Sequence, residues 1–77
     1  MSIRFPAVCA KDVIKVLNKI GFEFSRRAGG SHVIYRNLET NQRVVIPIHP
    51  KTIIKRKTLK SILHSVSLTV DEFRKLL

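Results

Sequence analysis

The spacing of the apolar residues changes twice along the chain, and this change constrains the fold more than any other feature. Between Ala10 and Ile20 the apolar side chains recur at the helical period, with lysines every four residues on the opposite side. Strand-like segments follow, and the helical period returns between Leu59 and Val66. We therefore expect strands between two amphipathic helices.

A pair of glycines separates the first two strand-like segments. Phe22–Arg27 alternates apolar and polar residues, which is typical of a half-buried strand with both phenylalanines in the core. Gly29 and Gly30 supply the dihedral freedom that a tight hairpin turn needs, and the second strand is predicted over Ser31–Arg36. The sequence does not decide which face of this strand carries His32, because polar and apolar residues occur on both sides.

Three further segments complete the predicted order. Arg43–Ile48 is rich in β-branched residues, which predicts a third strand that its prolines end or place at an edge. The second helix contains Leu59–Val66, with Thr58 as its predicted N-cap. A T-x-x-E capping box at Thr69 predicts a short helix from Val70 to about Leu76.

This order predicts an α+β fold in which a helix, a three-stranded antiparallel sheet, a second helix and a short C-terminal helix follow one another. Helices on one face of the sheet would bury every apolar stripe. A chain of 77 residues has room for one core, and its 44% of hydrophobic residues are enough to form one. We expect a single domain over residues 1–77.

The amino-terminal region and the cysteine content indicate the cellular compartment in which the protein is expected. Cys9 is the one cysteine, so an internal disulfide is excluded, and no Cys/His spacing of the zinc type occurs. The apolar run Phe5–Ala10 is short and contains Pro6, so we predict neither a signal peptide nor a membrane span. These features predict a cytoplasmic protein without a metal or other cofactor.

Basic residues outnumber acidic ones fifteen to five, and the formal net charge is +10. A field of this size favours a polyanionic partner such as RNA. The stretch between Thr40 and Val70 contains no acidic residue and is expected to face phosphates. The candidate RNA-binding residues are Lys11, Lys15, Lys19, Arg26, Arg27, Lys55, Arg56, Lys57 and Lys60.

Histidines are the candidates for acid or base chemistry. Cleavage of RNA through its 2′-hydroxyl needs a base, an acid and positive charge around the phosphate. His32 directly follows the two glycines and Ser31, His49 lies in the basic stretch, and His64 is expected to be solvated on the second helix. The carboxylates are few and scattered, which argues against a two-metal centre. A single histidine in a basic domain is more often structural or RNA-contacting than catalytic, so the residues alone do not assign catalysis to His32.

Four segments resemble the HicA family of toxin ribonucleases in sequence and order. They are AKDVIKVLNKIGF at Ala10–Phe22, GGSHVIY at Gly29–Tyr35, VIPIHP at Val45–Pro50 and TLKSILH at Thr58–His64. The resemblance implies a fold like the double-stranded RNA-binding domain, metal-independent cleavage of messenger RNA, and a HicB-type antitoxin as partner. It also implies that His32, the histidine of Gly-Ser-His, is catalytic, with His49 as a candidate second acid or base.

The chain departs from this family in a few positions. Val33 and Ile34 stand where many relatives carry further histidines, which leaves the general acid open. Lys57 and Ser67 replace glycines that relatives often have around the second helix. Met1–Cys9 is longer than the family needs and is interpreted as an N-terminal extension.

Two other functions compete with the toxin. A non-catalytic RNA-binding module would use the same basic surface, with His32 only as a contact or turn residue. A small structural or DNA-associated protein would need the charge and no particular histidine.

Overall fold

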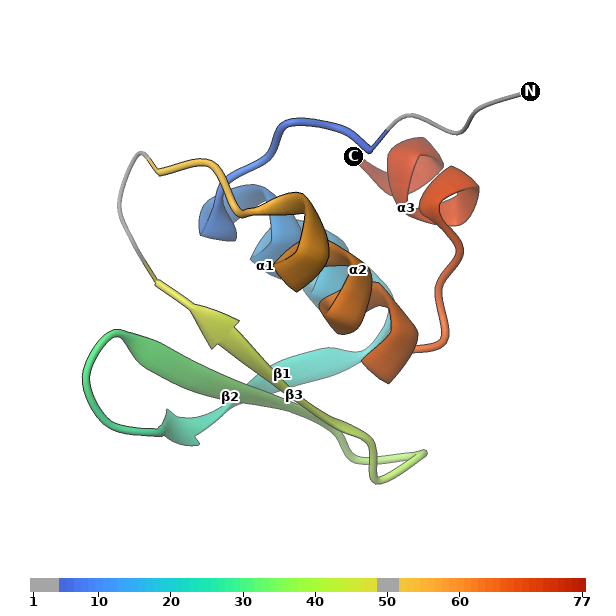
Figure 1. Cartoon of the computed structure of the whole chain (residues 1–77). Coiled ribbons are helices and arrows are strands. Elements are labelled where there is room, and N and C mark those ends of the chain that lie inside the picture. The colour runs from blue at the N-terminus through green and yellow to red at the C-terminus, as the bar shows by residue number, and fades with distance from the viewer. Residues whose placement is uncertain (1–4, 49–51) are drawn as a thin grey trace.

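The computed structural model describes residues 5–48 and 52–77. The elements are α1 (Ala10–Lys19), β1 (Phe22–Arg27), β2 (His32–Asn37), β3 (Arg43–Pro47), α2 (Arg56–Ser65) and α3 (Val70–Leu76). The strands form one antiparallel sheet in the order β1-β2-β3, and the helices lie on one side of it (Figure 1). This confirms the predicted α+β fold, which is consistent with that of the double-stranded RNA-binding domain.

The first helix packs its predicted apolar stripe into the core, and a glycine follows its C-cap. Val16 and Leu17 are fully buried, and Gly21 follows the helix with a φ of +96°. At the other end, the Asp12 carboxylate accepts hydrogen bonds from the backbone N–H of Cys9 at 3.1 Å and from its thiol at 3.3 Å. These bonds favour the ionised form and lower the pKa of Asp12.

The strand register decides which residues face the helices. Val33 pairs with Ile46 and Tyr35 with Val44, and all four side chains are buried in the core. Successive residues of a strand point to opposite faces, so His32 lies on the side that the helices leave uncovered. We call this side the open face of the sheet.

Phe24 is not a core residue, and this corrects the sequence prediction. Its side chain is 56% exposed, whereas that of Phe22 is 1% exposed. Phe22 is the first residue of the edge strand β1, and burial stops after it: every later residue of the strand, Phe24 included, is exposed. The hairpin to which this strand leads extends past the helices (Figure 1). Alternation predicted the correct face, but it could not show how far along the strand the helices reach.

The prediction that Thr58 caps the second helix is also wrong. The α2 helix begins at Arg56, with Lys55 as the N-cap, so Thr58 lies inside its first turn. The reason is the segment before the helix, where the N–H of Ile54 donates to the carbonyl of Val8 at 2.8 Å. This contact holds the chain extended up to the first helical residue, so the helix starts earlier than the apolar pattern indicated.

The last two helices are joined by well-defined caps. After α2, the N–H of Ser67 donates to the carbonyl of His64 at 3.2 Å and that of Leu68 to Leu63 at 2.9 Å, which is a Schellman motif. Ser67 occupies the left-handed position of this motif with a φ of +59°. At the start of α3, the predicted capping box at Thr69 is confirmed.

Part of the segment interpreted as an extension contributes to the core. Val8 is 4% exposed, and Phe5 packs against the core from its edge. None of the helices in residues 5–48 and 52–77 is long and apolar enough to cross a membrane.

Candidate functional site

His32 is the first residue of β2, and its side chain is exposed on the open face. The backbone around it is fixed, since its N–H donates to the carbonyl of Gly29 at 3.2 Å and its carbonyl accepts from Ala28 at 3.0 Å. Gly29 and Gly30 have φ values of +91° and +54°, which L side chains rarely adopt. The structure therefore presents the imidazole on a hydrogen-bonded hairpin with solvent access.

The turn before His32 leaves room for a ligand. In the described structure, no atom outside the immediate turn lies within 4 Å of the position that a Cβ would occupy at Gly29 or Gly30. Glycine is needed here for its backbone conformation, and the space beside the backbone stays open. A phosphate or a ribose can approach this hairpin closely.

Three arginines share the open face with His32. Arg26 pairs with Ile34, and Arg36 pairs with Arg43, and residues paired across antiparallel strands lie on the same face. The guanidinium of Arg36 donates to the Asn41 side chain at 2.9 Å. This face thus combines a histidine with several cations.

The sequence prediction included only part of this arginine group. Arg26 was expected at the site, and the structure places it on the face of His32. Arg36 and Arg43 were not among the candidates; alternation along β2 signals Arg36, but only the β2–β3 register adds Arg43. Arg27 pairs with Val33 and therefore lies on the opposite face.

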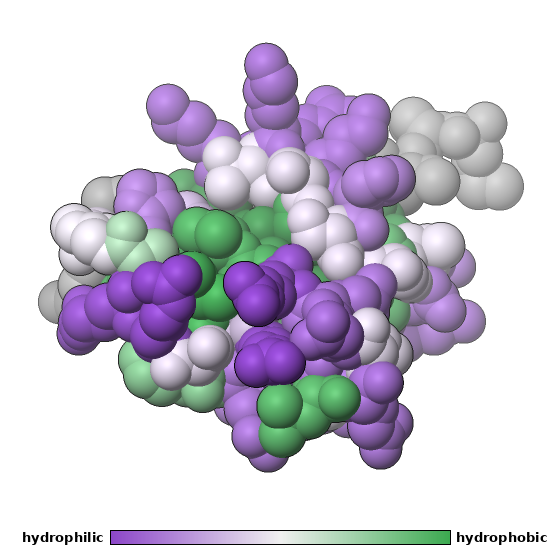
Figure 2. Space-filling view, turned by 90° about the horizontal axis from the view of Figure 1, so that it is seen from below, coloured by the Kyte–Doolittle hydropathy of each residue, from purple (hydrophilic) through white to green (hydrophobic). Residues whose placement is uncertain are grey.

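The open face also carries apolar surface. Seen from the side opposite the helices, strongly hydrophilic side chains lie across the middle of the molecule, and apolar atoms are visible beside them and at the lower edge (Figure 2). Val45 is 50% exposed and Ile34, its register partner, is half-buried. Glu23, the register partner of Arg36, adds one carboxylate to this face.

A hollow of about 260 Å³ lies between the end of β3 and the start of α2. It is lined by Pro47, which pairs with His32, and by Lys55 and Thr58 at the start of α2. The first turn of α2 contains no acidic residue, and the N-terminus of a helix carries partial positive charge. Among the predicted RNA-binding residues of the basic stretch, Lys55 lines the same hollow as Pro47, the register partner of His32.

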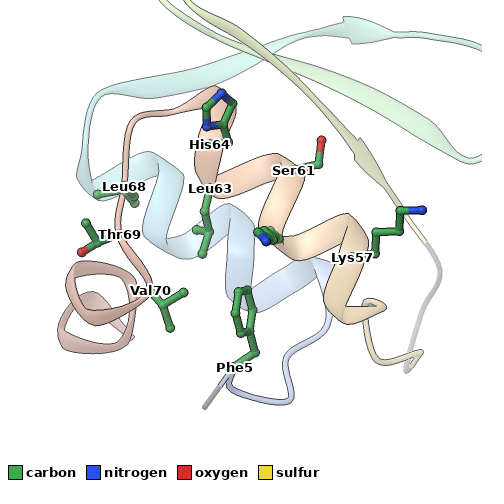
Figure 3. A pocket seen from close by; sticks show the side chains of 9 residues that line it. Phe5, Lys57, Ser61, Leu63, His64, Leu68, Thr69 and Val70 are labelled. Carbon is green, nitrogen blue, oxygen red and sulfur yellow. The ribbon is translucent and has the colours of Figure 1, made fainter. Parts of the chain in front are cut away.

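The other predicted cations are spread over the molecule. The Arg56 guanidinium lies 5.1 Å from the centre of the Phe5 ring. Lys57 and Lys60 line a second, largely apolar groove of about 470 Å³, together with His64 (Figure 3). The structure does not gather these residues beside His32.

The lysines of α1 differ from one another in their contacts. The Lys19 ammonium donates to the carbonyl of Leu76 at 2.7 Å and so links α1 to the end of α3. Lys11 and Lys15 are exposed. Lys19 thus has a structural contact that the regular lysine spacing did not reveal.

The described structure places no second histidine beside His32. His49 lies outside the described residues, and His64 is exposed on α2. In residues 5–48 and 52–77, no group of three or more His, Cys, Asp or Glu side chains is arranged to hold a metal ion.

Comparison with known proteins identifies the family. No curated protein matches the chain. A family model described as "HicA toxin of bacterial toxin-antitoxin" matches residues 10–68, which include both long helices and the whole sheet. The match covers more than half of the chain, and the hairpin that carries His32 lies within it. The chain therefore belongs to the HicA family of toxins from bacterial toxin-antitoxin systems.

Proposed function

We propose that this toxin is a metal-independent endoribonuclease that cleaves messenger RNA, with His32 as its catalytic acid or base. The observation that carries the proposal is the exposure of His32 on a face that also bears Arg26, Arg36 and Arg43. Membership of the HicA family supports it and implies neutralisation by a HicB-type antitoxin.

The arrangement suits cleavage through the 2′-hydroxyl of RNA. His32 takes the proton of this hydroxyl, and the 2′-oxygen forms a bond to the adjacent phosphorus. The bond from phosphorus to the 5′-oxygen breaks, and that oxygen receives a proton from an acid. The products are a 2′,3′-cyclic phosphate and a 5′-hydroxyl. Arg26, whose partner Ile34 is two residues from His32 along β2, is the open-face arginine placed to stabilise the negative charge that develops on the phosphate oxygens. Arg36 and Arg43, at the other end of β2, contact a neighbouring phosphate in this proposal.

His49 is our candidate for the acid that protonates the 5′-oxygen. In the sequence it directly follows Ile48, whose N–H donates to the carbonyl of Ser31 next to His32. Lys55 and the basic residues beyond it on α2 are proposed to bind RNA phosphates further from the cleaved bond.

His32→Ala tests the catalytic role. We expect cleavage of a defined RNA to fall by about 10²- to 10⁴-fold, the usual contribution of a positioned acid or base, while RNA affinity and melting temperature stay near wild type. His64→Ala is the matched control, because His64 is also exposed but lies on α2. Cleavage is measured in EDTA, where wild-type activity should persist.

The alternative functions give different results in the same assay. Full activity of a folded His32→Ala protein would contradict the catalytic assignment. Wild-type protein that binds RNA without cleaving it would instead support the non-catalytic RNA-binding module. Activity lost in EDTA would contradict only the metal-independent mechanism.

A further inference from the structure

Phe24 is exposed in a way that the other phenylalanines are not. Phe22 and Phe73 are each 1% exposed, and Phe5 is half-buried beneath the Arg56 guanidinium. Phe24 leaves 56% of its surface in solvent. Burial would stabilise such a ring, so its exposure on an ordered strand indicates a surface that is available to a ligand.

The Phe24 ring is held in position by Tyr35. The two rings meet edge to face, with centres 6.0 Å apart and planes at 82°. Tyr35 itself is 8% exposed and belongs to the core. Phe24 is thus a supported aromatic ring, and little conformational freedom is lost when a planar group stacks on it.

The strand edge beside Phe24 is irregular and basic. Phe24 pairs with Tyr35 and Arg26 with Ile34, so Ser25 is an extra residue without a register partner in the described sheet, which is a β-bulge. Arg26 lies on the open face and Arg27 on the helix side. The two arginines therefore place positive charge on both sides of the same strand edge.

A polynucleotide strand can pass from His32 to Phe24 around this edge. The sheet order makes β1 an outer strand, and no other described strand pairs with its far side. Tyr35, the partner of Phe24, is three residues from His32 along β2, about 10 Å of strand, but Phe24 and Tyr35 lie on the helix side of the sheet and His32 lies on the open face. An RNA strand that leaves the cleaved bond and turns around the β1 edge can place a later nucleotide on Phe24 while Arg26 and Arg27 contact its phosphates.

We propose that Phe24 is a stacking residue for an unpaired base of the RNA substrate, on the part of the strand that leaves the cleaved phosphate around the β1 edge. The proposal rests on the proposed ribonuclease function and adds that the substrate is single-stranded at this point. An aromatic face accepts any base, so the site selects unpaired nucleotides without selecting their identity. A protein partner on the same ring is the competing occupant.

A tryptophan introduced at position 24 provides a direct test, because the chain contains no tryptophan of its own. Phe24→Trp is prepared in the His32→Ala protein so that RNA is not cleaved during the measurement. Leu38→Trp is the matched control, since Leu38 is 67% exposed but lies in the turn after β2. The probes are a uridine oligonucleotide and an abasic oligomer with the same number of phosphates.

Stacking predicts a specific pattern of fluorescence. The uridine oligonucleotide should quench the emission of the Phe24→Trp protein, whereas the abasic oligomer, bound through charge alone, should leave it unchanged. The Leu38→Trp protein should respond to neither probe. Unchanged emission of the Phe24→Trp protein with RNA shown to be bound by anisotropy would overturn the stacking role and leave the ribonuclease proposal standing. No RNA binding at all would overturn both.

Affinity measurements provide the second arm. Phe24→Ala should weaken binding of the uridine oligonucleotide by about 5- to 150-fold and leave binding of the abasic oligomer unchanged. Phe24→Tyr should restore the affinity, and melting temperatures show whether each variant is folded. Weaker antitoxin binding with unaltered RNA affinity would overturn the proposal and assign Phe24 to the protein interface.

Discussion

Asn37 connects three segments at the end of β2. Its side-chain oxygen accepts the N–H groups of Glu39 at 2.9 Å and Thr40 at 3.2 Å, which fixes the turn to β3. Its amide nitrogen donates to the carbonyl of Ile20 at 3.4 Å, at the end of α1. Asn37 is 8% exposed, so these groups have little access to water.

Replacing Asn37 tests this connection. Asn37→Ala leaves the N–H groups of Glu39 and Thr40 without their acceptor, and we expect a loss of about 1–3 kcal/mol of unfolding free energy. Urea denaturation measures the change, with Asn18→Ala on the exposed side of α1 as the control. Equal, small effects of the two substitutions would show that the bonds of Asn37 do not determine stability.

Predictions for single residues were correct where neighbouring residues in the sequence determine the conformation. They failed where contacts between segments far apart in the sequence determine burial or position. The glycines of the hairpin were predictable because a tight turn needs their backbone conformation. The exposure of Phe24 was not, because it depends on where the helices end over the sheet. Arg43 joins the candidate site only through its register with Arg36, which no local pattern reveals.

At the scale of elements, the two helices after the sheet begin differently. The N–H of Glu72 donates to the Thr69 hydroxyl at 3.1 Å, and the Thr69 N–H donates to the Glu72 carboxylate at 2.9 Å. The α2 helix instead has Lys55 as its N-cap, and the Lys55 side chain makes no capping bond within the described structure. A sequence motif predicted the first start correctly, whereas α2 begins where contacts with the N-terminal segment hold the chain.

Thr69→Ala should therefore destabilise the protein more than Thr58→Ala. We expect a loss of about 1 kcal/mol for Thr69, the usual effect of removing an N-cap, with activity per folded molecule retained. Thr58 is the matched control because it lies inside the first turn of α2 rather than at its cap. A larger loss for Thr58 in urea denaturation would show that the helix start has been misplaced.

The Glu72 carboxylate of the same capping box makes the stability of the protein depend on pH. The hydrogen bonds from Thr69 lower the pKa of Glu72 below its usual 4.5. A lowered pKa in the folded state stabilises the fold above the usual value, and this stabilisation disappears as the pH falls through the lowered value. The backbone N–H of Thr69 is the main cause and remains in Thr69→Ala, so the test is Glu72→Gln: the difference in unfolding free energy between wild type and Glu72→Gln should be smaller at acid pH than at neutral pH.

At the scale of the whole molecule, the helices cover one face of the sheet and leave the other free. Apolar periodicity predicted this layering, because the apolar stripe of each helix has to be buried and one face of the sheet can cover them all. The distribution of charge was less predictable. Basic residues that are close in sequence separate in space, since Arg26 and Arg27 lie on opposite faces and Lys57 lines a groove apart from His32.

The salt dependence of RNA binding shows which of these basic surfaces holds the substrate. Removing one cation that contacts a phosphate of single-stranded RNA makes the plot of log binding constant against log salt concentration less steep by about 0.7. Replacing Arg26 and Arg43 with Gln should therefore lower the slope by about 1.4 if both contact phosphates. Arg74 and Lys75, in the last turn of α3, are the matched control, because their replacement removes the same charge away from the open face. We expect that pair to change the slope little. Equal changes for the two pairs would mean that the net charge of +10 attracts RNA without a defined surface, and the open face would lose its assignment as the binding site.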